Sequence, residues 1–251
     1  MVQAMICFVD IEHEQVLRDL NRRNSHLAYC MDVKLRLEEI SGTPCIVQRF
    51  GDVTCQGLRR LGITAIVIGG NATDWIEYPG DAWVDMHQII RAAEWPILGI
   101  CGGHQLIAMA HGAPLGPMRP LWPGEPDITS LSGPGYLKEW GFTSVSLVKA
   151  DPVFDGLHRP PVFLEMHYWE VKQVSSGFEI LASSDQCQIQ VMKRSDKPVY
   201  GTQFHPEGYT DGPCDSRSIL VNLVYPEGYG QERSDGKEFL ANFLQIAGKP
   251  S

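Results

Sequence analysis

The sequence contains no long hydrophobic run, although 43% of its 251 residues are hydrophobic. A membrane-spanning helix needs about 18 or more consecutive apolar residues, and no stretch of this chain approaches that length. The first residues, MVQAMICFVDIEHE, also lack the basic start of a secretory signal peptide. We therefore expect a cytoplasmic protein without a membrane partner.

Positive charge is scarce and is not clustered. Lysine and arginine together number 21 against 30 aspartates and glutamates, which gives a net charge of -9. A nucleic-acid-binding domain usually carries a basic patch or stripe, so we expect no nucleic-acid partner. The acidic excess otherwise favours solubility.

The seven cysteines follow no pattern of disulfides or of metal ligands. Their number is odd, their spacing is irregular and no C-x-x-C pair occurs. Such usage is typical of a reduced, cytosolic protein in which most cysteines are small buried residues. Nothing in the sequence requires a metal ion or an organic cofactor.

The first half of the chain has the order of strands and helices that builds a doubly wound sheet. Ile63–Ile68 (ITAIVI) is a β-branched run without polar alternation, as in strands of a parallel sheet that are covered on both faces. It ends at Gly69-Gly70, and a helix over 82–93 is predicted before a second buried strand over 96–100 and a helix over 102–111. This alternation predicts an α/β fold with a mainly parallel central sheet flanked by helices.

The other elements are predicted from shorter patterns. Helices are expected over 27–40, 53–61 and 238–247, and strands over 5–9, 45–47, 143–148, 162–165, 179–183, 187–192 and 199–204. The segments 114–135 and 208–236 are rich in glycine and proline and are expected to be loops. No linker or repeat divides the chain, so we expect one domain over residues 1–251 with a small antiparallel β extension.

Cys101 stands where a buried strand runs into a helix, in the segment LGICGGHQ. Glycines lie two residues before it and two residues after it, which is the spacing of a nucleophile elbow. Such a sharp, strained turn leaves no space for flanking side chains. The start of the next helix favours an anion, and the N–H of Gly102 is a candidate donor to an oxyanion. Cys101 is therefore a candidate nucleophile; the alternative is a buried cysteine beside glycines that only allow close packing.

His205 and Glu207 form a second candidate group, in the segment VYGTQFHPE. A strand is predicted to end at His205, and Pro206 favours an extended residue before it. Residues two apart in an extended segment face the same way, so Glu207 is expected to reach the imidazole and to fix its tautomer. The alternative is a surface turn. The nearest competitor is His167 with Glu170, in a segment interpreted as a loop that either lines the site or lies at the surface.

The segments GICGGHQ and GTQFHPE together resemble the G-x-C-x-G-x-Q and G-x-Q-F-H-P-E motifs of class I (triad) glutamine amidotransferases. The resemblance runs from about Ile63 to Glu207 and resumes in the C-terminal helix. It implies the flavodoxin-like fold of that family and an enzyme that hydrolyses the side-chain amide of L-glutamine, or of a related γ-glutamyl substrate, through a cysteine thioester. It also implies that the ammonia passes to a partner synthase or ligase.

The resemblance implies a role for each site residue. Cys101 attacks the amide, His205 protonates the departing ammonia and later activates water, and Glu207 orients His205. The other implied roles are oxyanion donors at Gly70 and Gly102 and substrate-binding positions at Gly69, Asn71, Gln105 and His167. The chain departs from the family pattern at Asn71, where proline is common, and in the polar stretch 12–36 and the insert 208–236, which are unusual.

Two other functions remain open at this stage. The chain could be a free-standing γ-glutamyl hydrolase that cleaves γ-glutamyl amines or peptides and passes nothing on. It could also be an inactive paralogue that serves as a binding or regulatory module. The complete set of Cys101, His205 and Glu207 argues against the second alternative, since inactive relatives commonly lose the nucleophile.

Overall fold

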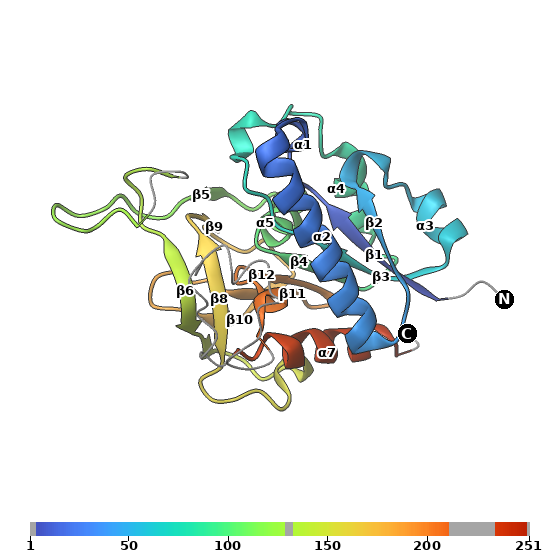
Figure 1. The fold of residues 1–251 in the computed structure, drawn as a ribbon. Coiled ribbons are helices and arrows are strands. Elements are labelled where there is room, and N and C mark those ends of the chain that lie inside the picture. Colours follow the sequence, from blue (N-terminus) through green and yellow to red (C-terminus); the bar gives the residue numbers. More distant parts are fainter. Residues whose placement is uncertain (1–3, 129–132, 211–233, 250–251) are drawn as a thin grey trace.

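An eight-stranded sheet forms the centre of the protein, in the strand order β2-β1-β3-β4-β12-β11-β10-β7. The computed structural model describes residues 4–128, 133–210 and 234–249 (Figure 1). Within these residues, no helix combines the length and the apolarity needed to span a membrane. The predicted doubly wound α/β fold is confirmed.

The five strands from β2 to β12 run parallel to one another. They are β2 (Cys45–Arg49), β1 (Met5–Asp10), β3 (Ile63–Ile68), β4 (Ile97–Ile100) and β12 (Val199–Thr202). The central strands are buried on both faces, as their continuous apolar sequences predict. All of these strands were expected from the sequence, and β3 has the predicted bounds.

The other three strands continue the sheet in antiparallel pairing and form the expected β extension. They are β11 (Val191–Arg194), β10 (Phe178–Ser183) and β7 (Ser146–Leu147). Two further antiparallel pairs lie beside them, β5 (Leu115–Pro117) with β9 (Trp169–Val171), and β6 (Glu139–Ser144) with β8 (Val162–His167). Figure 1 shows these two pairs together at one side of the molecule.

Helices cover both faces of the sheet. They are α1 (Glu14–Arg18), α2 (Leu20–Ser41), α3 (Cys55–Leu61), α4 (Val84–Ala92), α5 (Gly102–Ala110) and α7 (Gly236–Ala247). Short 3-10 helices lie at η1 (Phe50–Asp52), η2 (Trp75–Glu77), η3 (Pro152–Phe154) and η4 (Pro206–Gly208). Along β1, Ile6 and Phe8 pack in the core with α2 and α7, whereas Cys7 and Val9 pack with α3, α4 and α5. The alternation of side chains along a strand therefore supplies both cores.

Helix α2 begins earlier than the sequence predicted. A helix was expected over 27–40, but α2 starts at Leu20, because the side chain of Asp19 accepts a hydrogen bond from the N–H of Asn21 and caps the helix. It ends at Gly42, which has a φ of 66°. Figure 1 shows α2 crossing in front of the sheet.

Four predictions for the second half of the chain were wrong in position. Leu115–Pro117, in the expected loop 114–135, forms strand β5. The strand expected over 143–148 is divided at the buried Val145, where the chain leaves its pairing with β8 and joins β10. The strand expected over 187–192 starts only at Val191, because the Ser184 hydroxyl accepts from the N–H of Cys187 and forms a turn. Residues 167–170, expected as a loop, belong largely to strands β8 and β9. Of the expected loop 208–236, residues 211–233 lie outside the described residues.

Candidate active site

Cys101 occupies a strained turn between β4 and α5. Its φ of 49° and ψ of -104° are unusual for a residue with a side chain, so the turn is held in place by its surroundings. A Cβ atom at Gly99 would lie 2.4 Å from the carbonyl oxygen of Gly103, and one at Gly103 would lie 2.3 Å from that of Ile68. The flanking glycines are therefore needed, as predicted, because a side chain at either position would collide with neighbouring backbone atoms.

His205 and Glu207 contact each other inside the protein. Nδ1 of His205 lies 2.8 Å from Oε1 of Glu207, and the two residues are 5% and 1% exposed. The predicted pairing is confirmed in the structure, but its expected cause was wrong. Strand β12 already ends at Thr202, and η4 turns Glu207 back toward the ring. The N–H of His205 donates to the carbonyl of Leu164 at 2.8 Å, which fixes the start of this turn.

The structure brings Cys101 and His205 together beneath Gly70. A Cβ atom at Gly70 would lie 3.3 Å from Cε1 of His205 and 3.4 Å from Cβ of Cys101. Burial alone would lower the pKa of His205, but the charge of Glu207 and the hydrogen-bonding contact with Cys101 outweigh burial and raise that pKa well above its usual value. The ring is thus stabilised as an imidazolium.

Asn71 packs against the first turn of α5. Its Oδ1 lies only 1.8 Å from the position that a Cβ atom at Gly102 would take, so Gly102 must lack a side chain. The side-chain amide nitrogen (Nδ2) of Asn71 donates to the backbone carbonyl of Thr73 at 2.6 Å. Asn71 therefore closes the loop on itself at the position where the family often has proline.

Glu12 holds the same loop from the N-terminal side. It is 2% exposed, and its carboxylate accepts from the N–H of Ala72 at 2.7 Å and from that of Thr73 at 3.3 Å. Gly69 lies against Phe8, where a Cβ atom would come within 2.7 Å of the ring. The loop from Gly69 to Thr73 is thus fixed next to Cys101 by residues that follow or belong to β1.

A buried amide network supports Cys101 from below. The Nε2 of Gln203 donates to the sulfur of Cys101 at 3.6 Å, and the Oε1 of Gln203 accepts from Gln105 at 3.0 Å. Gln105 also donates to the carbonyl of Trp169 at 2.9 Å and accepts from the indole of Trp75 at 2.6 Å. Both ends of the Gln105 side chain are therefore occupied by protein groups.

His167 lies between two buried glutamates. Its Nε2 is 3.0 Å from Glu139 and 3.3 Å from Glu165, and its Nδ1 is 3.0 Å from the carbonyl of Trp169. Burial would lower the pKa of His167, but the two carboxylates raise it, while burial raises the pKa of Glu165. His167 lines the pocket next to Cys101, yet both of its ring nitrogens already have partners.

A pocket of about 720 Å³ opens above Cys101 and His205. One wall comes from the N-terminal part of the chain, namely Glu12, Asn21, Arg22, Ser25, His26 and Tyr29. Other lining residues include Lys138, Trp140 and Trp169. This volume lies in the range of small-molecule sites. The unusual polar stretch 12–36 therefore forms a wall of the candidate active site.

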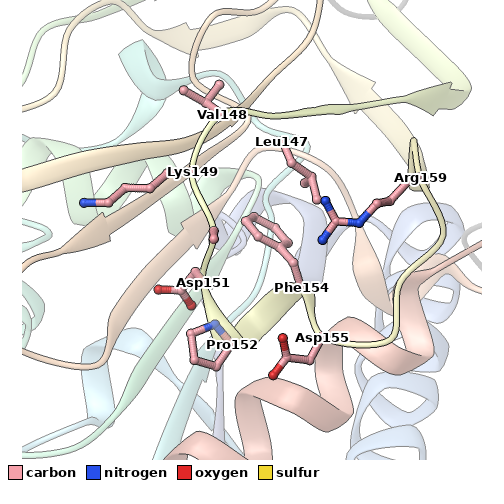
Figure 2. A pocket seen from close by; sticks show the side chains of 9 residues that line it. Leu147, Val148, Lys149, Asp151, Pro152, Phe154, Asp155 and Arg159 are labelled. Atoms are coloured by element: carbon pink, nitrogen blue, oxygen red, sulfur yellow. The ribbon is translucent and has the colours of Figure 1, made fainter.

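A second pocket of about 350 Å³ shares no lining residue with the first. Figure 2 shows Asp151, Asp155 and Arg159 around Phe154 in this pocket. The carboxylate of Asp151 accepts from Lys193 at 2.6 Å and from the hydroxyl of Tyr200 at 3.1 Å. No residue of the candidate triad lines this pocket, so it is not part of the candidate active site.

Two groups of side chains in the described part of the chain have the spacing of metal ligands. They are Asp10 with His26 and Cys30, and Glu139 with His167 and Cys187. Protein groups already bind the carboxylates in both. Arg49 lies 2.7 Å from Asp10. Ser184 and Gln190 donate to Glu139 at 2.5 and 2.7 Å. Neither group is needed to explain the arrangement around Cys101.

Sequence reasoning missed several residues of this site. Glu12 and Tyr29 come from the N-terminal stretch, and Gln203 lies inside the second motif without an assigned role. Only Gln203 carried a local signal, because it stands two residues before His205 in a buried segment. His104, three residues after the nucleophile, lies against Gly201; burial lowers its pKa to about 3, so it remains neutral.

Comparison with known proteins identifies relatives of this chain. The family model described as glutamine amidotransferase class-I matches residues 55–217, more than half of the chain. A glutamine-hydrolyzing GMP synthase subunit from Methanocaldococcus jannaschii is 42% identical over 115 residues, which cover 46% of this chain and 52% of that protein. The chain thus spans about half the length of this and other such relatives.

Other relatives extend the comparison. The corresponding GMP synthase subunit of Archaeoglobus fulgidus is 33% identical over 147 residues, covering 59% of this chain and 68% of that protein. A solved structure of a glutamine amidotransferase from Thermotoga maritima has a TM-score of 0.64 at 16% identity, over 96% of this chain and 97% of that one. At such low identity the structure supports the fold alone.

Proposed function

Because the chain belongs to the class I glutamine amidotransferase family, we propose that it hydrolyses the side-chain amide of L-glutamine and delivers the ammonia to a partner synthase. One observation carries the proposal. Cys101, on a strained turn at the start of a helix, contacts the imidazole of His205, which lies 2.8 Å from the buried carboxylate of Glu207. A nucleophile, a base and a group that orients the base are the parts that covalent amide hydrolysis requires.

The reaction has two chemical steps. In the first, the thiolate of Cys101 attacks the amide carbon, and the C–N bond breaks as His205 gives its proton to the departing ammonia. In the second, water attacks the thioester while His205 removes one of its protons, and glutamate leaves with the thiolate restored. The products are glutamate and ammonia, so the reaction consumes one water. Glu207 keeps the ring oriented in both steps.

The oxyanion of each step is assigned to two backbone donors. The N–H of Gly102 belongs to the first residue of α5, where the helix dipole favours negative charge. Gly70 lies directly over Cys101 and His205, which supports its N–H as the second donor. Gly69 and Asn71 hold this loop in position. We therefore assign them an indirect role in substrate binding, in which they fix the shape of the pocket wall.

Gln105 and His167 are assigned a role in shaping the pocket. Both line it, but their polar atoms are bound to other protein groups, including the carbonyl of Trp169. Substrate contact through these side chains would require those bonds to break. Their proposed effect on glutamine binding is therefore to fix Trp169, which itself lines the pocket.

The proposed partner is a synthase that consumes ammonia. The relatives named as GMP synthase subunits make a synthase of that kind the first candidate for testing. The test is to measure ammonia release from glutamine by the isolated chain and with that candidate partner, using Cys101→Ala as the control. A glutamine-analogue electrophile should label the peptide that contains Cys101. Absence of both turnover and labelling, with and without the partner, would refute the proposal.

A second candidate function is hydrolysis of larger γ-glutamyl amines. It is favoured by the pocket of about 720 Å³, which exceeds what a molecule the size of glutamine needs. The same ammonia assay, extended to the release of substituted amines, separates the two functions. Turnover of γ-glutamyl amines without turnover of glutamine would support the second candidate.

A further inference from the structure

The hydroxyl of Tyr29 reaches the candidate triad from the N-terminal helix α2. It donates a hydrogen bond to Oε1 of Glu207 at 3.0 Å, although the two residues are 178 positions apart in the sequence. Tyr29 is 8% exposed. It lies outside both motifs and outside the matched residues 55–217, so the family pattern assigns it no role.

Glu207 depends on few hydrogen bonds. Its Oε1 accepts from both His205 and Tyr29, whereas its Oε2 has no hydrogen-bond partner among the described residues. The residue is 1% exposed, and a buried carboxylate is costly unless donors stabilise its charge. Tyr29 therefore provides one of the two donors that stabilise the ionised side chain.

Tyr29 remains a donor over the whole range in which the enzyme would act. Burial and the nearby charge of Glu207 raise the pKa of Tyr29 well above its usual value, so the hydroxyl keeps its proton. The ring also packs edge-on against Phe8, with centroids 6.3 Å apart. The hydroxyl thus has a fixed position and a fixed protonation state.

Helix α2 also contacts the segment that carries Glu207 at a second residue, Tyr209. Arg36, seven residues after Tyr29 and so on the same face of the helix, donates to the carbonyl of Tyr209 at 3.0 Å. Its guanidinium also lies 4.2 Å from the centroid of the Tyr209 ring. The segment that carries Glu207 is therefore bound to α2 at both Glu207 and Tyr209.

We propose that Tyr29 is a positioning residue that holds the carboxylate of Glu207 toward His205, and so acts through Glu207 on the pair of Cys101 and His205. This inference rests on the proposed function. A hydrogen bond to the charged form favours that form, so the hydroxyl extends activity to lower pH. Without it, His205 is the one hydrogen-bond donor left to the carboxylate of Glu207 among the described residues, and the contact between the two side chains is held less firmly.

The test is Tyr29→Phe, which removes the hydroxyl and keeps the ring. We expect kcat/KM for glutamine to fall at least about tenfold on the acidic side of its pH profile, as for a lost hydrogen bond to a charged group. The acidic limb should move to higher pH, because a hydrogen bond to a charged group favours its charged form. KM should stay within about twofold, since the hydroxyl donates to Glu207.

The matched control is Tyr200→Phe. It removes another buried tyrosine hydroxyl that donates to a carboxylate, that of Asp151 in the pocket of Figure 2. We expect Tyr200→Phe to leave the acidic limb unchanged, even if its melting temperature falls. An acidic limb for Tyr29→Phe that coincides with those of wild type and Tyr200→Phe would overturn the proposal, whatever happens to its stability.

A second measurement separates this inference from the proposed function. The rate at which iodoacetamide alkylates Cys101, followed by mass spectrometry of its peptide, reports the thiolate without any turnover. If the wild-type chain hydrolyses no glutamine, the proposed function fails, but the pH profile of alkylation still tests Tyr29. A shift of that profile to higher pH in Tyr29→Phe supports the inference, and an unchanged profile refutes it.

Discussion

Replacing Glu207 with glutamine removes the charge that faces His205 and keeps the size of the side chain. In the wild-type protein the carboxylate lies 2.8 Å from Nδ1 of His205, and its charge counteracts the effect of burial on the ring. In Glu207→Gln the contact with Cys101 remains, but the effect of burial on the ring is opposed less strongly. We therefore expect the pKa of His205 to fall in the variant.

The size of this effect follows from the geometry. An opposite charge within hydrogen-bonding distance typically shifts a pKa by about 1–3 units, and each unit corresponds to about 1.4 kcal/mol. Loss of the charge of Glu207 should therefore reduce kcat/KM for glutamine by about 10-fold to 10³-fold. The effect should be largest at high pH. In the wild type, the raised pKa of His205 keeps the imidazolium that protonates ammonia present up to higher pH. The alkaline limb of the profile should therefore move to lower pH in the variant.

The assay is the pH profile of kcat/KM for glutamine, measured with the partner if the isolated chain needs one. The control is Glu94→Gln, since Glu94 forms a surface ion pair with Arg59 at 2.6 Å. We expect the control to keep the wild-type profile, because surface ion pairs contribute little. An alkaline limb for Glu207→Gln at the wild-type position, with wild-type kcat/KM, would show that the carboxylate does not act on His205.

Three further changes test other parts of the site. Cys101→Ala should abolish turnover and leave the melting temperature close to that of the wild type; measurable wild-type-like turnover would refute the nucleophile. His205→Ala should lower kcat by at least about 10²-fold, the usual contribution of general acid–base catalysis, and a loss below tenfold would contradict that role. Gly103→Ala should lower the free energy of unfolding by about 1–3 kcal/mol, because its Cβ atom would lie 2.3 Å from the carbonyl of Ile68. The control is Gly51→Ala, which should be close to neutral because its Cβ atom would meet nothing within 4 Å. Thermal or urea unfolding measures this difference, and equal stability of the two glycine variants would contradict the packing argument.

The fold could be predicted well where a pattern was local and strong. Ile63–Ile68 is a continuous apolar run, and it forms β3 with the predicted bounds. Prediction failed where a partner strand decides the pairing. The Trp169–Val171 strand exists because Leu115–Pro117, from a segment expected to be loop, lies beside it. Neither segment has a sequence pattern that specifies this contact.

The candidate site, too, could be predicted where a pattern was local and not where distant segments meet. The turn at Cys101 could be predicted because glycines at fixed spacing are a local requirement of its backbone. The contact between His205 and Glu207 was predicted for the wrong reason, since a 3-10 turn rather than an extended strand brings them together. Spacing in the sequence identified the residues but not the backbone path between them.

The sequence by itself determined which residues carry the candidate chemistry, because the nucleophile, the base and the acid lie in two short motifs whose requirements are local. Only the tertiary structure decided what supports them. Tyr29 reaches Glu207 and Glu12 reaches the loop at Ala72, across gaps of 178 and 60 positions. Such contacts depend on how α2 and the end of β1 pack over the sheet, and no local pattern in a polar stretch encodes that packing.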